Sequence, residues 1–306
     1  MTNPPARTPE DQPGRLRVGV IGAGRVGSVL GAALHRAGHR VVATAAVSAA
    51  SLARAARLLP EAEVLSADEV ARRADLLLLA VPDDTLSDLV AGLVRTAAVR
   101  PGQIVFHTSG AHGVVVLAPA TQAGAFCLAL HPVMTFTGRP EDLDRIGGIS
   151  YGITAPPELR PVAESLVVEM GGEPEWLAET DRPLYHAALA HGANHLTTLI
   201  NEAIELLRQA GVAHPERMIA PLLSAAVDNA LRLGDGALTG PVVRGDARTV
   251  VSHLETLTAR APESVAAYLA LARRTSDRAI DSGRLRTLDA EDLLGVLTNP
   301  QQGATT

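Results

Sequence analysis

The sequence of 306 residues contains no lysine, and all 27 of its basic side chains are arginines. Chemistry that needs a lysine ammonium group or a lysine Schiff base is therefore excluded for this chain. The 33 acidic side chains outnumber the arginines, which gives a formal net charge of −6. Because a protein that binds nucleic-acid phosphates needs a basic face, this charge argues against a nucleic-acid partner.

Cysteine, aromatic residues and long apolar runs are also scarce. The single cysteine, Cys127, excludes an intrachain disulfide and a zinc cluster of thiolates, and it favours a reducing, cytoplasmic location. No apolar run reaches the ~20 residues of a membrane-spanning helix, so no membrane partner is expected. Aromatic residues make up 2% of the chain and hydrophobic residues 47%, so alanine, leucine and valine must fill the core.

The chain is long enough for two domains. Residues 1–15 are polar and rich in proline and lack the apolar segment of a signal peptide, so we expect a disordered tail. Over residues 16–180, apolar segments alternate with helical patterns, which predicts an α/β Rossmann domain with a doubly wound, mainly parallel sheet. Residues 181–298 show helical patterns alone, which predicts an all-α domain, and residues 299–306 are expected to form a loose tail.

The periodicity of the apolar residues predicts the individual elements. The predicted strands are residues 17–21, 40–46, 63–65, 76–81, 104–107, 125–131 and 149–154. Helices of the first domain are predicted over residues 26–37 and 51–59. Helices of the second domain are predicted over residues 184–210, 215–233, 247–260, 263–281 and 289–297. The helix over 184–210 would be ~40 Å long, and Thr180-Asp-Arg-Pro183 before it offers a cap and a first-turn proline.

The segment Gly22-Ala-Gly-Arg-Val-Gly27 matches the pattern G-x-G-x-x-G between a predicted strand and a predicted helix. In such a motif the first glycine makes a tight turn, the second lets a pyrophosphate approach the backbone, and the third lets helix and strand pack closely. The helix N-terminus adds free N–H groups. The alternative is a glycine turn in an unrelated domain. We predict dinucleotide binding by Gly22, Ala23, Gly24, Arg25, Val26 and Gly27.

The stretch about 20 residues beyond the motif bears on the choice of dinucleotide, because NAD sites usually place an acid there. Residues 43–51 contain no acid, and the next one is Glu61. Ser48, Ser51 and Arg54 can instead receive a 2′-phosphate, so NADP is predicted over NAD. The alternative is that these residues form an ordinary loop and helix start.

Two polar segments follow predicted strands, at the edge where open parallel sheets bind ligands. Val81 and Pro82 in the first segment, and Thr108 and Ser109 in the second, are predicted to lie near the nicotinamide or the substrate. Asp83 or Asp84 is expected to cap the helix that follows.

A polar stripe runs along the helix predicted over 184–210, with residues three and four apart. The stripe consists of Ala187, His191, Asn194, Thr198, Asn201 and Glu205. Short polar groups of this kind favour a site or a helix–helix contact over a solvated face, which would carry more charge.

Histidine can donate the proton that a carbonyl or imine needs after hydride transfer. The candidates are His186 and His191 on the long helix and His107 and His131 at strand ends, whereas His35, His39 and His214 are expected on the surface. His191 and His195 have the spacing of a helical metal pair, but a third ligand is not evident, so no metal is expected.

Residues 238–246 form a predicted loop with two residues of interest. Asp246 is expected to cap the following helix. The planar fork of Arg244 can bind a carboxylate through two parallel hydrogen bonds, so it can hold an acidic substrate or a cofactor phosphate.

The order of these motifs resembles that of the Rossmann-like family of candidate NADP oxidoreductases whose C-terminal half is domain of unknown function 2520. The resemblance spans Leu16 to Leu297. It is carried by the glycine motif, His107-Thr-Ser-Gly110, His131-Pro132 with Thr135-Phe136, His186-Ala-Ala with Asn194, Pro221-Leu-Leu, Leu238-Thr-Gly-Pro and Arg244-Gly-Asp246.

The resemblance implies a fold like that of pyrroline-5-carboxylate reductase and the 6-phosphogluconate dehydrogenase superfamily, with a homodimer built through the helical domains. In related hydroxyacid dehydrogenases a lysine precedes an asparagine on the long interdomain helix. His191 precedes Asn194 at that place here, so the lysine-based mechanism does not transfer. The family pattern favours His186 as proton donor, whereas the helical spacing favours His191.

The sequence thus predicts an NADP-dependent reductase for a small C=O or C=N substrate, such as a 2-oxo acid or a cyclic imino acid. NADPH is expected to deliver hydride and His186 or His191 the proton, while Asn194 orients the substrate and Arg244 holds an anionic group. Two alternatives stay open. One is a non-catalytic NADP-sensing or scaffolding protein, and the other is an NADP oxidoreductase that uses a deazaflavin.

Overall fold

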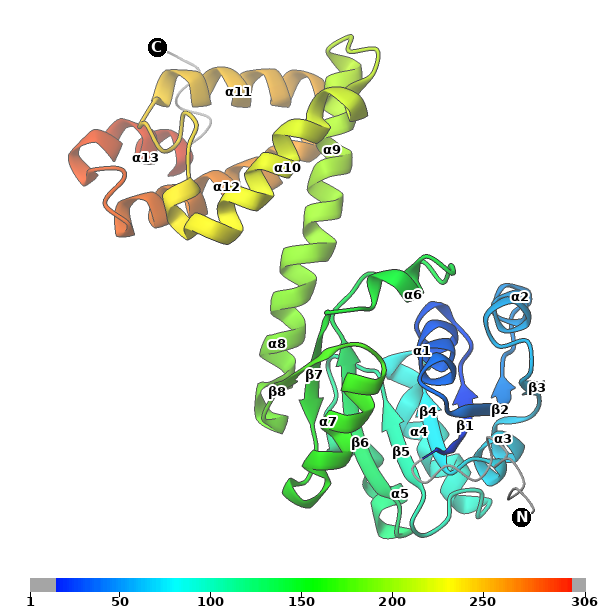
Figure 1. Ribbon diagram of the computed structural model, residues 1–306. Helices are drawn as coiled ribbons and strands as arrows, with labels where there is room; N and C mark the ends of the chain where they lie inside the picture. The colour runs from blue at the N-terminus through cyan, green and yellow to red at the C-terminus, as the bar shows by residue number, and fades with distance from the viewer. Residues whose placement is uncertain (1–14, 299–306) are drawn as a thin grey trace, which may run out of the picture. The chain divides into compact units, whose positions relative to one another are not determined.

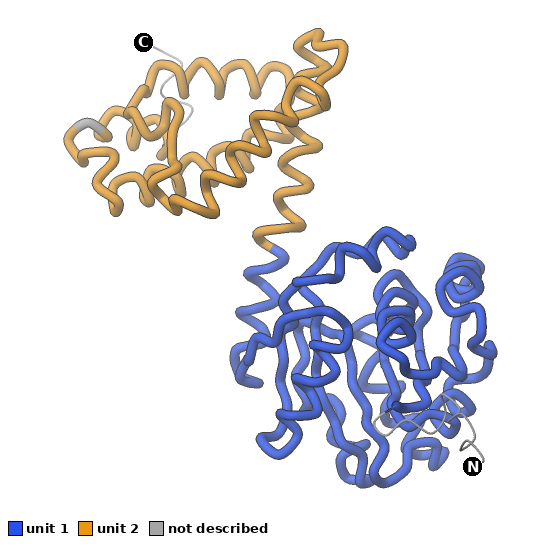
Figure 2. The backbone as a smooth tube through the Cα atoms, in the orientation of Figure 1, with its two compact units in different colours: residues 1–190 blue, residues 191–306 orange. Residues whose placement is uncertain are grey.

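The structure is a computed structural model that describes residues 15–298 (Figure 1). The chain divides into two compact units, residues 1–190 and residues 191–306 (Figure 2). The predicted tails fall outside the described residues, apart from Arg15, which is exposed. Within the described range, no helix combines the length and the apolar character needed to cross a membrane.

Unit 1 is built on an eight-stranded sheet with the strand order β3-β2-β1-β4-β5-β6-β7-β8. Neighbouring strands are parallel except for the antiparallel pair of β6 and β7. The strands are β1 (Arg17–Ile21), β2 (Arg40–Ala45), β3 (Glu63–Val64), β4 (Leu76–Leu79), β5 (Ile104–His107), β6 (Phe126–Pro132), β7 (Ser150–Thr154) and β8 (Glu173–Trp176). The predicted fold class is confirmed, and the strand order reverses between β1 and β4, where such sheets bind ligands.

Helices cover both faces of this sheet (Figure 1). The helices of unit 1 are α1 (Arg25–Arg36), α2 (Ala49–Leu58), α3 (Ala67–Arg73), α4 (Asp83–Arg95), α5 (Ala118–Gln122), α6 (Asp142–Arg145), α7 (Arg160–Glu169) and α8 (Arg182–Leu189). Strand β4 joins two cores: Leu76 and Leu78 pack with α1 and α7, and Leu77 and Leu79 pack with α3 and α4. Because successive side chains of a strand point to opposite faces, a strand buried on both faces must be apolar throughout.

The edge strand β8 is absent from the sequence prediction. Its residues, Glu173-Pro-Glu-Trp176, pair with β7 in parallel. Two acids and a proline have low strand propensity, so the segment shows no strand pattern. An edge strand accommodates both features, since proline needs no partner on its open side and charge discourages further pairing.

His39 is buried, so the expectation that it lies on the surface is wrong. Its residue is only 2% exposed, and its Nε2 pairs with the Glu169 carboxylate of α7 at 2.7 Å. Its Nδ1 accepts a hydrogen bond from the Leu16 amide. The His39 ring therefore connects Leu16, just before β1, to α7. His35 and His214 are exposed, as expected.

The described part of unit 2, residues 191–298, is helical and contains no strand. Its α-helices are α9 (His195–Gln209), α10 (Pro215–Leu233), α11 (Ala247–Arg260), α12 (Pro262–Asp281) and α13 (Glu291–Thr298). Its core joins Val242 and Val243 of the loop before α11 to apolar side chains of α11, α12 and α13. In α9 no residue is buried, and in α10 only Pro215 is.

The helix predicted over 184–210 is interrupted, which corrects the sequence prediction. A π-helical turn, η5 (Ala190–Asn194), separates α8 from α9. Gly192 and Asn194 are weak helix formers, which favours an irregular turn at this place. A π turn contains an extra residue and displaces later side chains by about 100° around the axis. The six predicted stripe residues therefore do not share one continuous face.

Candidate functional site

The glycine loop between β1 and α1 is held against the end of β4. Gly22 has φ +96°, and a Cβ added there would lie 2.4 Å from the Ala80 carbonyl oxygen. A Cβ on Gly27 would lie 2.2 Å from the Gly22 carbonyl oxygen. Both positions therefore require glycine for the tight turn and for close packing, as the motif predicts.

Gly24 has a different environment, because no heavy atom lies within 4 Å of a Cβ built there. Helix α1 starts directly after it with no side-chain cap and no acid in the first turn. The amide of Ala23 donates to the Ala45 carbonyl at 3.3 Å, so it is already engaged. An open glycine before an uncapped helix N-terminus fits a pyrophosphate, which would accept hydrogen bonds from first-turn amides such as those of Arg25 and Val26.

The residues predicted for a 2′-phosphate lie at the start of α2. Ser48 is the N-cap of this helix and accepts a hydrogen bond from the Ser51 amide, while the Ser51 hydroxyl donates to the Ser48 carbonyl. Arg54, one turn further, faces Gly138: a Cβ there would lie 2.8 Å from the Arg54 Nε. The two serines thus stabilise the start of α2. Of the three residues predicted to receive the 2′-phosphate, Arg54 supplies the positive charge.

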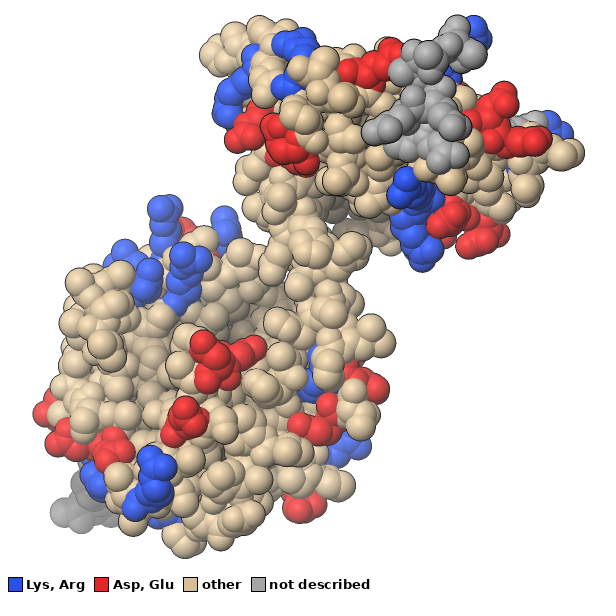
Figure 3. Space-filling view, turned by 180° about the vertical axis from the view of Figure 1, so that it is seen from behind, with Lys and Arg blue, Asp and Glu red and all other residues tan. Residues whose placement is uncertain are grey.

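A loop that the sequence analysis missed lies beside the glycine motif. A Cβ on Gly138 would lie 3.2 Å from the Arg25 Cα, and Arg57 donates to the Gly138 carbonyl at 2.7 Å. Figure 3 shows basic side chains gathered along one edge of unit 1. Arg25, Arg54 and Arg57 therefore meet around one loop.

Asp142 holds this loop in place. Its buried carboxylate accepts hydrogen bonds from the amides of Thr137 and Gly138, at 2.7 Å and 2.8 Å, and from the Thr137 hydroxyl. Burial alone would raise the pKa of Asp142, but these hydrogen bonds outweigh it and leave the pKa below its ordinary value. The segment carries no local motif, so only the fold brings it to the site.

His107 at the end of β5 is a structural histidine. Its Nε2 donates to the Gly113 carbonyl at 2.8 Å, and its Nδ1 accepts from the Ser109 amide. Burial lowers the pKa of His107 to about 4, so the ring is neutral at neutral pH. The neighbouring Ser109 hydroxyl accepts from the His112 amide, while Thr108 is half-buried.

The segment after β4 is arranged differently from the prediction. Pro82 is the N-cap of α4, and neither Asp83 nor Asp84 makes a capping hydrogen bond; both lie in the first turn instead. The expectation that one of them caps the helix is therefore wrong. A carboxylate in the first turn still interacts favourably with the helix dipole, so the acids fit their positions without capping. Val81 is partly buried and packs against the core around β4.

A cluster of aromatic side chains lies at the ends of β5 and β6. The Tyr185 hydroxyl and the His131 Nδ1 are hydrogen-bonded at 2.7 Å, and the ring centroids of His131 and His186 are 6.5 Å apart. A Cβ on Gly110 would lie 2.8 Å from the His186 ring and 3.1 Å from the His131 ring. The glycine of the His107–Gly110 segment thus makes room for both histidines.

Arg182 is a buried cation near His131 of this cluster, and it is only 1% exposed. It donates to the Thr154 hydroxyl and to the carbonyls of Ser109, Ala129 and Gly152. Burial, and then the charge of Arg182, lower the pKa of His131 to about 4. The sequence indicates Arg182 only as part of a helix start and indicates no role for Tyr185, since neither belongs to a recognisable motif.

The remaining predicted site residues belong to unit 2. His191 and Asn194 are exposed in the π-helical turn, and the Nδ1 atoms of His191 and His195 are 3.1 Å apart. In the described part of the chain, no group of three or more His, Cys, Asp or Glu is arranged to hold a metal ion. Asp246 accepts from the Thr249 amide at 3.1 Å, which confirms the predicted cap of α11.

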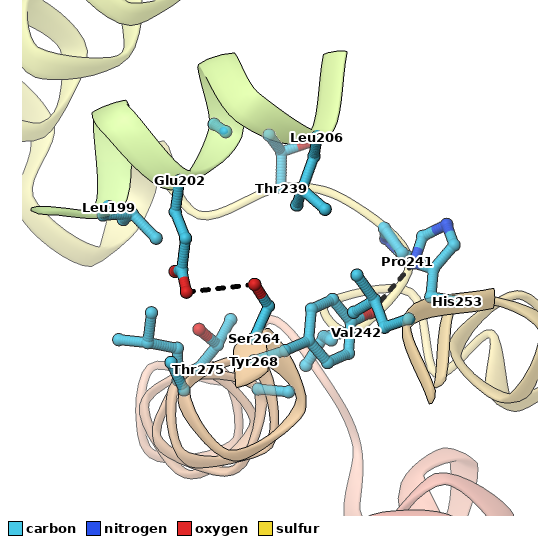
Figure 4. A pocket seen from close by; sticks show the side chains of 15 residues that line it. Leu199, Glu202, Leu206, Thr239, Pro241, Val242, His253, Ser264, Tyr268 and Thr275 are labelled. Carbon is cyan, nitrogen blue, oxygen red and sulfur yellow. Dashed lines mark hydrogen bonds between the residues drawn. The ribbon is translucent and has the colours of Figure 1, made fainter. Parts of the chain in front are cut away.

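A mainly apolar cavity of about 360 Å³ lies between α9, α11 and α12 (Figure 4). Four of its polar groups form two pairs: the Ser264 hydroxyl donates to the Glu202 carboxylate, and His253 is hydrogen-bonded to the Tyr268 hydroxyl. None of the predicted catalytic residues lines it.

Two family models match the chain. The model described as a Rossmann-like domain matches residues 1–132, and the model of domain of unknown function 2520 matches residues 149–275. The second match includes β7, α7 and β8 of unit 1 besides much of unit 2. The chain thus joins a Rossmann-like domain to a domain of unknown function 2520, which confirms the resemblance seen in the sequence.

Several solved structures share the fold, whereas no curated protein gives a significant match. A candidate NADP oxidoreductase from Bacteroides fragilis is 23% identical with a TM-score of 0.73, over 86% of this chain and 98% of that one. A pyrroline carboxylate reductase from Plasmodium falciparum with NADP bound is 11% identical, with a TM-score of 0.55, over 90% and 98%. A reductive aminase from Aspergillus terreus with NADPH and ethyl levulinate is 19% identical, with a TM-score of 0.60, over 92% and 99%.

The different surroundings of Gly27 and Gly24 predict different effects of the same substitution on stability. Gly27→Ala places a methyl group 2.2 Å from a backbone oxygen, so we expect a loss of stability of about 3 kcal/mol. Gly24→Ala meets open space at φ −72°, so its stability should stay within about 0.5 kcal/mol of the parent. Urea unfolding followed by circular dichroism measures both. Equal stability of the two variants would contradict the described loop.

The neutral state of His107 predicts how the stability of the protein depends on pH. Its pKa is near 6.5 in an unfolded chain and about 4 in the folded protein. Between these values the unfolded chain binds more protons, so stability is present above the unfolded pKa and is lost as pH falls toward 4. The contribution of His107 is about 3 kcal/mol.

The variant His107→Gln tests this contribution, because glutamine keeps an N–H group for the Gly113 carbonyl but does not titrate. The free energy of unfolding should fall less steeply between about pH 7 and pH 4 in this variant than in the parent. Parallel pH profiles would show that His107 is not held neutral.

Proposed function

We propose that this protein is an NADP-dependent reductase that acts on a small C=O or C=N substrate, in particular one that carries a carboxylate. The observation that supports this most directly is the glycine loop, which is closed at Gly22 and Gly27 and open at Gly24, ahead of an uncapped helix. The solved structures with this fold support the same function, since their names include NADP oxidoreductase, pyrroline carboxylate reductase and reductive aminase.

In this proposal the cofactor is held by residues of unit 1. The pyrophosphate lies over the Gly22–Gly27 loop, and Arg54, with Ser48 and Ser51, receives the 2′-phosphate. Val81, Pro82, Thr108 and Ser109 border the nicotinamide side. Arg25 and Arg57 add positive charge around the same loop, which favours NADP over NAD because the 2′-phosphate is a dianion at neutral pH. When bound, NADPH supplies a hydride.

The proton donor is assigned by comparing the histidines near the sheet edge. His107 and His131 have pKa values lowered to about 4 by burial, so neither holds an extra proton there. His186 is only half-buried and lies next to the His131–Tyr185 pair at the carboxyl edge of the sheet. We therefore favour His186 as the donor, with His191 as the alternative. Asn194 orients the substrate, and Arg244 holds its anionic group.

The reductase proposal is tested by following NADPH oxidation across a panel of 2-oxo acids and cyclic imino acids. His186→Ala and Asn194→Ala should each lower kcat, by about a hundredfold for the histidine, since a positioned proton donor contributes this much. Gly24→Val should abolish NADPH binding while leaving the chain folded.

His35→Ala, an exposed histidine of α1, is the matched control and should leave turnover unchanged. Unchanged turnover in His186→Ala, His191→Ala and Asn194→Ala together would remove the proposed site. Saturable NADPH binding without turnover on the whole panel would favour a sensing protein instead.

We also propose that the chain forms a homodimer through its helical unit. Helix α10 exposes apolar side chains around much of its circumference: Leu222 is 68% exposed and Leu231 is 84% exposed. Met218, Val227 and Leu233 of the same helix are exposed as well. Several large apolar side chains exposed along one helix normally mark an interface, so a second copy is the partner that we propose for this surface.

Light scattering at micromolar concentration tests the dimer. The parent chain should have twice the mass of a single chain, and Leu222→Glu should shift the population toward the monomer, because a carboxylate cannot be buried in an apolar interface without a partner. Thr258→Glu, at an exposed position of α11, is the control for added charge. A monomeric parent chain would rule out the proposal.

A further inference from the structure

A second cavity of unit 2 has a strongly basic lining. Its volume is about 600 Å³, and three arginines are among the described residues that line it: Arg244, Arg284 and Arg286. Leu238, Thr239, Val243 and Leu285 also line it, and none of the lining residues that the structure describes is acidic. This concentration of positive charge contrasts with the net charge of −6 of the whole chain.

The backbone presents Arg244 from a rigid turn. The Arg244 amide donates to the Gly240 carbonyl, and the Asp246 amide donates to the Pro241 carbonyl. Val243, the residue before Arg244, is buried in the core of the unit. The Arg244 side chain, in contrast, is exposed.

Arg284 is presented in a similar way from the end of α12. The amides of Arg284 and Leu285 both donate to the Ala279 carbonyl, at 2.8 Å and 3.0 Å. Leu285 is only 4% exposed and belongs to the same core as Val243. Arg244 thus follows the core residue Val243, and Arg284 precedes the core residue Leu285. These core residues fix the backbone of both arginines at the cavity.

The charges of Arg244 and Arg284 are not neutralised within the described part of the chain, residues 15–298, where neither side chain forms an ion pair or a hydrogen bond. Asp246, the acid nearest to Arg244 along the sequence, is engaged in capping α11 through Thr249. Hydrogen bonds from Thr249 lower the pKa of Asp246, and Arg244 adds a smaller effect. Like charges around one cavity repel each other, so an anion would stabilise the arrangement.

We infer that Arg244 and Arg284, with Arg286 in the cavity wall, bind the phosphomonoester group of a small molecule. One guanidinium suffices for a carboxylate, whereas a phosphoryl dianion offers three oxygens to several arginine forks. The cavity is larger than a phosphate group, and Leu238, Val243 and Leu285 give it apolar surface for the rest of the molecule.

This inference deepens the proposed function, on which it rests for one point only: the bound phosphate belongs to the substrate of the reductase. The alternative source of the same chemistry is the 2′-phosphate of NADP. The arginine site itself is defined by residues of unit 2 and requires no turnover.

The experiment measures binding to the full chain by isothermal titration at constant ionic strength, without NADPH. The probes are inorganic phosphate and glycerol 3-phosphate, with glycerol and acetate as comparison compounds. We expect saturable binding of both phosphates, tighter than that of acetate, and no binding of glycerol. Arg244→Gln and Arg284→Gln should each weaken phosphate binding at least tenfold. Arg274→Gln, at an exposed arginine of α12 outside the cavity, should not.

Because the Arg244 and Arg284 side chains are exposed, both variants should keep the melting temperature of the parent when phosphate is absent. Absence of saturable phosphate binding to the parent, or equal affinity in all variants, would overturn the inference.

Titration of NADPH and NADH then identifies the source of the phosphate. A loss of affinity in Arg244→Gln for NADPH alone assigns the phosphate to the cofactor, and unchanged affinity for both assigns it to the substrate. Since these titrations need no turnover, failure of the reductase assay would leave the arginine site standing.

Discussion

The architecture of the candidate site depends on one close backbone approach, between the Gly22–Gly27 loop and the end of β4. The positive φ of Gly22 and the lack of a Cβ at Gly27 bring the start of α1 against Ala80. This contact fixes the helix N-terminus over the point where the strand order reverses. Any side chain at either position would push helix and sheet apart, and the first-turn amides would no longer point to the place where a pyrophosphate binds.

A second constraint is the buried guanidinium of Arg182. Its hydrogen bonds connect the carbonyls that follow β5 and those of β6 and β7 to the start of α8. The same charge disfavours protonation of His107 and His131, after the larger effect of burial. Arg182 thus anchors the helix that carries His186, and its charge helps to keep His107 and His131 neutral.

The sequence alone was sufficient for those parts of the fold in which local pattern and burial agree. Strands such as β1, β4 and β5 are short apolar runs, and α10 and α11 have the predicted bounds because proline, glycine and Asp246 mark their ends. Strand β8 was missed because Glu173, Pro174 and Glu175 give it no strand pattern, and it is stabilised by pairing with β7. The π-helical turn was missed because helical periodicity assumes a uniform repeat along the helix.

The candidate site was predictable only where a motif is contiguous. The glycine loop meets that condition. Arg182, Tyr185 and the Asp142 loop do not, because their partners lie far away in the sequence and only the fold brings them together: Arg182 contacts Ser109, 73 residues earlier. Likewise, only the fold brings Arg244 and Arg284 to one cavity. The sequence indicated a role for Arg244 alone.

The most direct test of the account is a crystal structure of the chain grown with saturating NADPH. The pyrophosphate should lie within hydrogen-bonding distance of the first-turn amides of α1, at Arg25 and Val26. A dinucleotide bound elsewhere on the chain, or a glycine loop that remains empty at saturation, would contradict it.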